Sequence, residues 1–317
     1  MFTKTVEQKL SGHSPRELAW RRFKSNKVAI PSLSVALFVI FAVVFAPVIY
    51  WMLGIDPEAR YMNALDERGE VPGDWNGISF EHPFGVIPGI GYDLLARMLF
   101  GARVSFLIAV ASVIVTVIIG LALGIIGGYF RGRIDGLIGR FTDFFLAFPT
   151  FFMIIALSVP LVDRLEKSGL VQGNEARVLY LILIFAIFGW PYLSRIIRSQ
   201  VISIRERDFV LSAEALGASN LRILAKEVLP NVWTPVIVYV SLALPGYLSA
   251  EAVLSYLGIG VEPPMPTLGT IIADSTKYMM NNPVYFFIPS LALILLVLTF
   301  NLLGDALRDA LDPKSEI

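Results

Sequence analysis

The sequence predicts an all-α membrane protein with six transmembrane helices. Hydrophobic residues make up 56% of the 317 residues and charged residues only 16%, whereas about 25% charged residues is usual in a soluble domain. A soluble globule of this length has too little interior to bury so much apolar surface. The apolar residues are also gathered in runs of about 20, the length that a helix needs to cross the hydrocarbon layer of a bilayer.

Six stretches have the length and hydropathy of a span. They are expected at 28–53, 104–129, 144–162, 178–197, 233–257 and 286–306. The first is too long for the apolar region of a signal peptide and lacks a clear cleavage site, so we interpret it as a retained span. The other parts are an N-terminal segment, an external segment, a long connection inside the five-helix core and a C-terminal tail. The N-terminal segment is 1–27 and the external segment is 54–103. The five-helix core is 104–306 and contains the long connection at 198–232, and the tail is 307–317.

The N-terminal segment contains a helix start. Ser14 can serve as N-cap, Pro15 suits the first helical position, and Glu17 can bond back to the cap. Trp20 and the basic residues around it favour a short helix that lies in the membrane interface. A solvated basic leader is the alternative.

The distribution of Lys and Arg predicts the orientation. When the N-terminus is placed in the cytoplasm, 18 of the 26 basic residues fall on the cytoplasmic side, as the positive-inside rule requires. An even number of spans then places both termini in the cytoplasm. The net charge of zero therefore conceals a basic cytoplasmic side and an acidic outer side.

Several chemical functions are excluded or poorly supported. The chain has no cysteine, so thiolate catalysis and Cys-ligated metals are excluded, and its charge pattern is not that of a nucleic-acid-binding domain. It has no G-x-x-x-x-G-K-[ST] phosphate loop and no H-E-x-x-H metal motif. His13 and His82 fall on opposite sides of the expected membrane, and we expect His82 to form a hydrogen bond within its loop. No catalytic residue, metal or cofactor is expected.

Two polar residues stand inside expected spans. Glu251 lies toward the outer end of the fifth span and Asn301 lies in the sixth. Polar groups are costly in lipid and usually face a protein interior or a water-filled path, so both are candidates for a translocation path. The alternative for Glu251 is a carboxylate held by hydrogen bonds between helices.

Small residues and one proline indicate how the spans pack. Gly120, Gly124 and Gly128 repeat every four residues in the second span, which lets another backbone approach closely, inside the subunit or in a partner. Pro245-Gly246 interrupts the fifth span, where the missing backbone donor permits a kink.

The connection at 198–232 is longer than is needed to join two neighbouring spans. Residues 208–216 are good helix formers, Gly217 is a natural helix stop, and Ser219 or Asn220 can cap a second short helix that Leu229-Pro230 would end. Two short helices joined at a glycine would protrude into the cytoplasm. Docking to a cytoplasmic partner and an amphipathic loop on the membrane surface are both compatible with this pattern.

This connection resembles the EAA motif of ATP-binding-cassette importer permeases, whose pattern is E-A-A-x3-G-x9-I-x-L-P. Aligned on Gly217 and Leu229-Pro230, Ala213 matches the second Ala of the motif. The match is incomplete. Leu211 stands at the Glu position, Ser212 at the first Ala and Glu227 at the Ile.

Further motifs resemble one branch of that family, the second-type permease subunit of dipeptide and oligopeptide importers. They are H-P-F-G at 82–85, G-Y-D at 91–93, G-A-R-V-S at 101–105, L-S-Y-L-G-I-G-V-E-P-P at 254–264 and L-G-D-A-L-R-D-A-L-D-P at 303–313. Nickel-importing relatives share these motifs, so a permease for nickel or another small solute is the alternative. A stand-alone secondary transporter is a further alternative, although the sequence shows no internal repeat.

The resemblance implies a type I importer permease in a bacterial cell membrane. It implies a pathway for di- or oligopeptides formed with a homologous permease subunit, two cytoplasmic ATPase subunits that hydrolyse ATP, and an external substrate-binding protein. The chain itself would be no enzyme, and its partners would include membrane lipid but no nucleic acid. The expected ATPase-coupling residues are Asp208, Ala213, Glu214, Ala215, Gly217, Ala218, Leu221 and Arg222.

Overall fold

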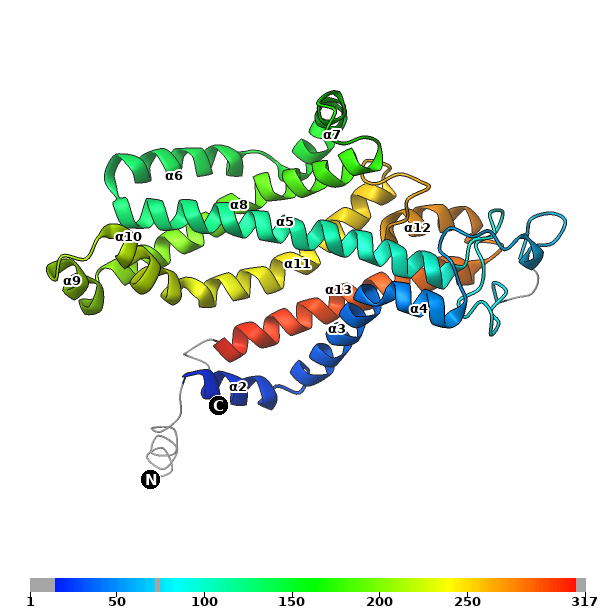
Figure 1. Ribbon diagram of the computed structural model, residues 1–317, viewed down its shortest axis with the longest axis horizontal. Coiled ribbons are helices and arrows are strands. Elements are labelled where there is room, and N and C mark those ends of the chain that lie inside the picture. The colour runs from blue at the N-terminus through cyan, green and yellow to red at the C-terminus, as the bar shows by residue number, and fades with distance from the viewer. Residues whose placement is uncertain (1–14, 72–74, 312–317) are drawn as a thin grey trace.

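The computed structural model describes residues 15–71 and 75–311, and helices dominate this part of the chain (Figure 1). Four helices here are long and apolar enough to span a membrane, and the number rises to six if each of two bent helix pairs counts as one span. The prediction of an all-α membrane protein is confirmed. Ser14, His13 and the chain beyond 311 lie outside the described residues.

The N-terminal part forms three helices. They are α2 (Pro15–Ser25), α3 (Ala29–Val44) and α4 (Ala46–Leu53). The predicted helix start at Pro15 is confirmed, and α2 meets α3 at 95°. The first expected span, 28–53, corresponds to α3 and α4 with an interruption at Phe45, where Pro47 in the first turn of α4 removes a backbone donor.

The two longest helices, α5 (Leu94–Phe130) and α8 (Asn174–Arg205), form the most extensive helix pair. They pack through the glycine repeat. A Cβ added at Gly124 would lie 2.7 Å from the Cβ of Ile197, and one at Gly128 would lie 2.7 Å from the Cβ of Val201. The glycines therefore serve packing inside the subunit. The helix begins ten residues before the expected span, which starts at 104, because a helix can continue past the membrane wherever its backbone remains hydrogen-bonded.

The third expected span, 144–162, is wrong as a single helix. Two helices, α6 (Gly132–Ala147) and α7 (Thr150–Lys167), meet at 86°. The break falls at Phe148, which is extended because the ring of Pro149 disfavours the helical conformation in the preceding residue. Helix α6 runs back along α5 and α8, whereas α7 turns out of the direction of α6 and packs on the first half of α8 (Figure 1).

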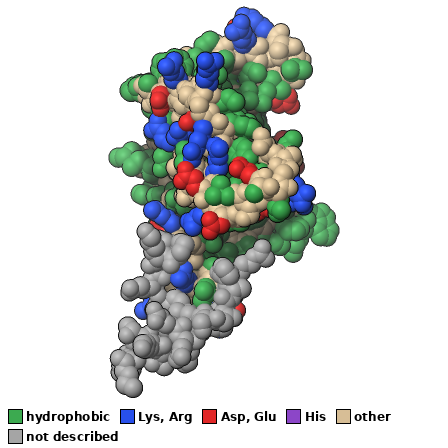
Figure 2. Space-filling model, turned by 90° about the vertical axis from the view of Figure 1, so that its left-hand side faces the viewer, with side chains coloured by type: hydrophobic (Ala, Val, Ile, Leu, Met, Phe, Trp, Pro, Cys, Tyr) green, Lys and Arg blue, Asp and Glu red, His purple; other side chains and the backbone are tan. Residues whose placement is uncertain are grey.

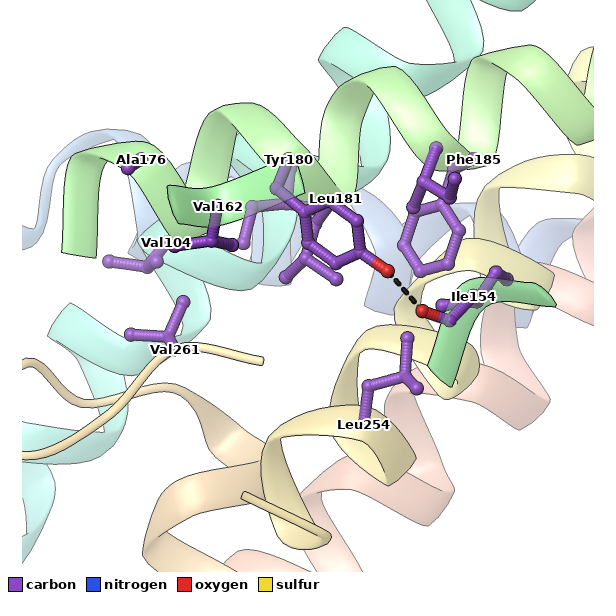
Figure 3. Packing of buried hydrophobic residues seen from close by; sticks show 11 residues of the cluster. Val104, Ile154, Val162, Ala176, Tyr180, Leu181, Phe185, Leu254 and Val261 are labelled. Atoms are coloured by element: carbon purple, nitrogen blue, oxygen red, sulfur yellow. Dashed lines mark hydrogen bonds between the residues drawn. The ribbon is translucent and has the colours of Figure 1, made fainter. Parts of the chain in front are cut away.

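A buried cluster fastens α7 to α8 (Figure 3). Ile154 and Val162 of α7 pack with Leu181 and Phe185 of α8. The hydroxyl of Tyr180 donates a hydrogen bond to the carbonyl of Ile154. The position of α7 is thus set by α8 even though the chain enters it through a sharp bend.

The connection after α8 forms α9 (Asp208–Ala215) and α10 (Asn220–Ile223). The expected helix end at Leu229-Pro230 is wrong. A π-helical turn, η2 (Leu224–Val228), and a 3₁₀ turn, η3 (Leu229–Val232), carry the helix on into α11 (Trp233–Tyr256). Pro230 stands in the first turn of η3, where a missing backbone donor is tolerated, and the π turn absorbs the change of helical register.

The last helices are α12 (Leu268–Ser275), the 3₁₀ turn η4 (Thr276–Tyr278) and α13 (Pro283–Leu311). Helix α13 packs against α11, α3 and α2. It contains the sixth expected span and continues to Leu311, so residues 307–311 of the expected tail are helical.

The chain between α4 and α5, which the sequence predicts to be external, is folded onto the start of α5, with one short 3₁₀ turn, η1 (Met62–Ala64). Asp93 caps α5 by accepting a hydrogen bond from the backbone of Ala96 at 2.8 Å. The His82 ring and the other oxygen of Asp93 are hydrogen-bonded at 2.8 Å, which confirms the hydrogen bond expected of His82. Gly85 is required nearby, because a Cβ there would lie 1.8 Å from the carbonyl oxygen of Asn76.

Replacing Gly124 with Leu should separate α5 from α8. The added side chain meets Ile197 and the backbone of Ser194 at less than 3 Å, so we expect a destabilisation of about 1–3 kcal/mol from overpacking. The thermal unfolding midpoint of the purified protein in detergent measures this. Gly139→Ala on α6 is the control, since a Cβ there meets no atom within 4 Å. An unchanged midpoint for Gly124→Leu would contradict the close packing.

Candidate coupling surface and translocation path

Helices α9 and α10 lie at one end of the molecule, beside the last turn of α5 (Figure 1). The bend between them is made by Gly217, whose φ is +76°, a conformation that glycine adopts without strain. Its amide donates to the carbonyl of Glu214 at 2.9 Å, and the amide of Ala218 donates to that of Ala213 at 3.0 Å. This is the Schellman pattern of a helix end, and it confirms the expected stop at Gly217.

One side of the bend is anchored in the protein. Val210 of α9 and Ile223 of α10 are buried and pack in one cluster with Tyr129, Val201 and Val228. These contacts fix the two short helices to the ends of α5 and α8. The helix pair is therefore held in a fixed position on the two long helices and is not a free loop.

The opposite side of the bend is exposed and partly apolar. Leu216 is 88% exposed and Leu221 is 80% exposed, on either side of Gly217. Two large apolar side chains exposed side by side at a protruding tip are a candidate interaction surface. We call the tip formed by residues 208–222 the knuckle.

The structure brings all expected coupling residues into the knuckle. The exposed ones are Asp208, Glu214, Ala215, Gly217, Leu221 and Arg222, and the half-buried ones are Ala213 and Ala218. Leu216 belongs to the same surface but was absent from the expected set. Its exposure depends on the exact end of α9, which the sequence does not define to the residue.

Tyr129 is the main contact that the sequence did not indicate. Its hydroxyl donates to Asn220 Oδ1 at 3.1 Å and lies 3.4 Å from Glu214 Oε1. Arg205 donates to the Tyr129 carbonyl at 2.5 Å and lies over its ring at 5.4 Å. One residue at the end of α5 thus holds α9, α10 and the end of α8.

Ion pairs reinforce the same end of the molecule. Asp135 of α6 accepts two hydrogen bonds from the guanidinium of Arg198 on α8. Arg131 pairs with Glu206 at 2.6 Å, across the two connections that leave α5 and α8. Figure 2, which looks onto this end, shows Lys and Arg side chains gathered over it.

Glu251 is fully buried between helices. Ser105 of α5 donates to one carboxylate oxygen at 2.6 Å, and Ser255 of α11 donates to the other at 2.7 Å. The start of α12 packs tightly nearby, since a Cβ on Gly269 would lie 2.3 Å from the carbonyl oxygen of Ala252. This geometry favours the alternative of hydrogen bonds between helices.

Asn301 is placed differently. It is exposed on α13, and its amide donates to the carbonyl of Val297 one turn earlier, at 3.0 Å. Among the described residues, no hydrogen bond joins Asn301 to Glu251. The two candidates for the path therefore do not form one site within this chain.

Replacing Tyr129 with Phe should loosen the knuckle without disturbing the long helices. The ring stays in its cluster, but the hydroxyl bonds to Asn220 and Glu214 are lost, at a cost of about 1 kcal/mol. Hydrogen–deuterium exchange should show about fivefold faster exchange in residues 208–222. Tyr192→Phe is the control, because Tyr192 is exposed on α8. Equal exchange in the two variants would show that the hydroxyl does not hold the knuckle.

The long apolar helices and the protruding knuckle between two of them define a multi-pass membrane protein of the permease class. A family model described as "Binding-protein-dependent transport system inner membrane component" matches residues 120–317. A second model, "N-terminal TM domain of oligopeptide transport permease C", matches residues 14–64. The chain belongs to the family of binding-protein-dependent transport system inner membrane components.

Curated relatives match nearly the whole chain. It is 34% identical to the dipeptide transport system permease protein DppC of Alkalihalophilus pseudofirmus, over 97% of this chain and 93% of that protein. It is 33% identical to the oligopeptide transport system permease protein OppC of Haemophilus influenzae, over 97% and 91%. It is 31% identical to the glutathione transport system permease protein GsiD of Pectobacterium atrosepticum, over 99% and 96%.

Solved structures show the same fold. Two crystal forms of the MetNI methionine ABC transporter in inward-facing conformations contain a chain that superposes with a TM-score of 0.53. The identities are 16% and 19%, and the match covers 69% of this chain and 98% and 96% of those chains. The predicted importer-permease fold is confirmed by this likeness.

Proposed function

We propose that this permease subunit imports dipeptides or oligopeptides through a pathway that it forms with a second, homologous permease. In this proposal two cytoplasmic ATPase subunits drive transport and an external substrate-binding protein delivers the solute. The observation that carries the coupling role is the knuckle, a rigidly seated helix pair with an exposed apolar tip. The names of the dipeptide, oligopeptide and glutathione relatives support a peptide substrate.

The knuckle suits docking into a groove on an ATPase. Leu216 and Leu221 would fill the groove, while Asp208, Glu214 and Arg222 would contact its polar rim. Tyr129 ties the knuckle to α5, and the helix from α10 through η2 and η3 ties it to α11. Movement of the ATPase would then shift α5 and α11 as rigid bodies and change the side from which the pathway is open.

We place the knuckle and both termini in the cytoplasm of a bacterium. The basic residues gathered at the knuckle end (Figure 2) support this orientation through the positive-inside rule. The described chain ends, at α2 and the end of α13, lie toward the same end of the molecule as the knuckle (Figure 1). The external segment and α12 then face the binding protein.

Gly217 provides the test of coupling. Gly217→Val should abolish peptide uptake and co-purification of the ATPase subunits, because a β-branched residue is strained at a positive φ and the bend would open. Gly217→Asn is the matched control, since Asn tolerates this conformation and a Cβ at 217 meets no atom within 4 Å. Uptake of a labelled dipeptide into vesicles, with excess oligopeptide or Ni²⁺ as competitor, measures activity and substrate class. Normal uptake and ATPase binding by Gly217→Val would contradict the coupling role.

Glu251→Gln distinguishes the two roles left for this residue. The amide keeps the size of the side chain and can accept a hydrogen bond from only one of the two serines. If Glu251 is only a packing tie, we expect a loss of stability of about 1–3 kcal/mol with unchanged transport kinetics per folded complex. If its charge faces the pathway in another state of the transport cycle, uptake should fall while the complex stays assembled. Ser255→Ala, which removes one donor and keeps the charge, is the matched control.

A further inference from the structure

An apolar groove lies beside the N-terminal helix, away from the knuckle and from Glu251. It has a volume of about 800 Å³ and runs between α2, the end of α13 and the start of α11. Leu18 and Phe23 of α2 line it together with Leu303 and Leu307 of α13, and Phe23 also packs directly against α13 beside the groove. Arg22 is the charged residue that contributes to its lining.

The orientation of α2 places this groove at the membrane surface. Helix α2 meets α3 at 95°, so it lies parallel to the surface when α3 crosses the bilayer. The Trp20 ring is half-exposed and stacks on Phe23 at 5.7 Å. An exposed Trp on a short helix with one apolar face is typical of the layer between headgroups and acyl chains.

The charged side chains around the groove indicate which kind of lipid headgroup would bind there. The basic side chains on α2 and the turn after it are Arg21, Arg22, Lys24 and Lys27, and the only acid whose side chain is described there is Glu17, which pairs with Arg21 at 3.5 Å. The end of α13 adds Arg308 and two acids, Asp305 and Asp309. The sum is positive, and basic residues next to an apolar slot attract anionic lipid.

We propose that this groove binds one anionic phospholipid. An acyl chain lies in the groove along the apolar side chains of α2 and α13, and the phosphate group lies at Arg22. The lipid contacts both α2 and α13, which also pack on each other, and reaches Thr234 at the start of α11. Its lining includes neither Glu251 nor Asn301, the two candidates for the transport pathway, so the proposal does not depend on which solute is carried.

The test uses the full-length chain, co-expressed with its permease and ATPase partners and reconstituted in lipid vesicles. The probes are phosphatidylglycerol and phosphatidylcholine that carry the same photoreactive acyl chain, and mass spectrometry of the labelled peptides locates the attachment. We expect phosphatidylglycerol to label α2 and the end of α13. Leu307→Trp, which fills the groove, should abolish this labelling, whereas the control Leu298→Trp, on an exposed part of α13, should leave it intact.

A second pair of variants tests the headgroup. Arg22→Gln should reduce the preference for phosphatidylglycerol about fivefold, the effect expected for one basic residue near an anionic lipid, and Arg133→Gln on α6 should not change it. Equal labelling by the two lipids in the unaltered protein, or undiminished labelling in Leu307→Trp, would overturn the proposal. Labelling that arises only after deletion of residues 1–13, or only in the chain without its partners, would also overturn it, because protein would then fill the groove.

Discussion

The close contact between α5 and α8 is the constraint on which the rest of the molecule depends. Without side chains at Gly120, Gly124 and Gly128, the backbones approach until the glycines meet Leu193, Ile197 and Val201 directly. In lipid this close packing supplies the attraction that the hydrophobic effect cannot supply between apolar helices. Because the two helices run side by side for most of their length (Figure 1), they form a rigid helix pair. The segment between α4 and α5 packs at one end of this helix pair, and the knuckle packs at the other end.

Glu251 organises the half of the bundle near the start of α5, and the glycines organise the half near the knuckle. Its two serine donors come from separate motifs, G-A-R-V-S on α5 and the L-S-Y-L-G stretch at the end of α11. Gly101 in the first motif permits the chain at Thr267 to approach, since a Cβ there would lie 3.0 Å from the Thr267 backbone. Motifs that are far apart in the sequence therefore meet at one buried carboxylate. A satisfied polar group in an apolar interior fixes one arrangement of helices, because other arrangements would leave it unpaired.

The parts that the sequence predicted are those determined by local composition. Apolar length located the spans, glycine spacing identified the close packing, and Gly217 identified the helix stop. The break at Phe148 was missed because the apolar run continues through it, although Pro149 carried the signal. Pro230 predicts a helix end that the structure does not have. A proline ends a helix only if the backbone cannot adjust, and the π turn at 224–228 provides that adjustment. The role of Tyr129 could not be predicted from the sequence, because its hydroxyl contacts Glu214 and Asn220, which lie 85 and 91 positions further along the chain.

The route from the knuckle to the bundle follows from these local facts. The knuckle is attached to α8 through the buried cluster of Val210, Ile223 and Val201. It is also attached to α5 through the Tyr129 hydroxyl, and to α11 through the backbone of η2 and η3. The backbone attachment is helical throughout, so it transmits displacement along its axis, whereas hydrogen bonds from one hydroxyl can rearrange at small cost. In the proposed coupling, a displacement of the knuckle would therefore reach α11 more directly than α5. Since Ser105 on α5 donates a hydrogen bond to Glu251 on α11, the two helices are joined again in their other half, and the proposed motion would have to keep or break that one buried contact.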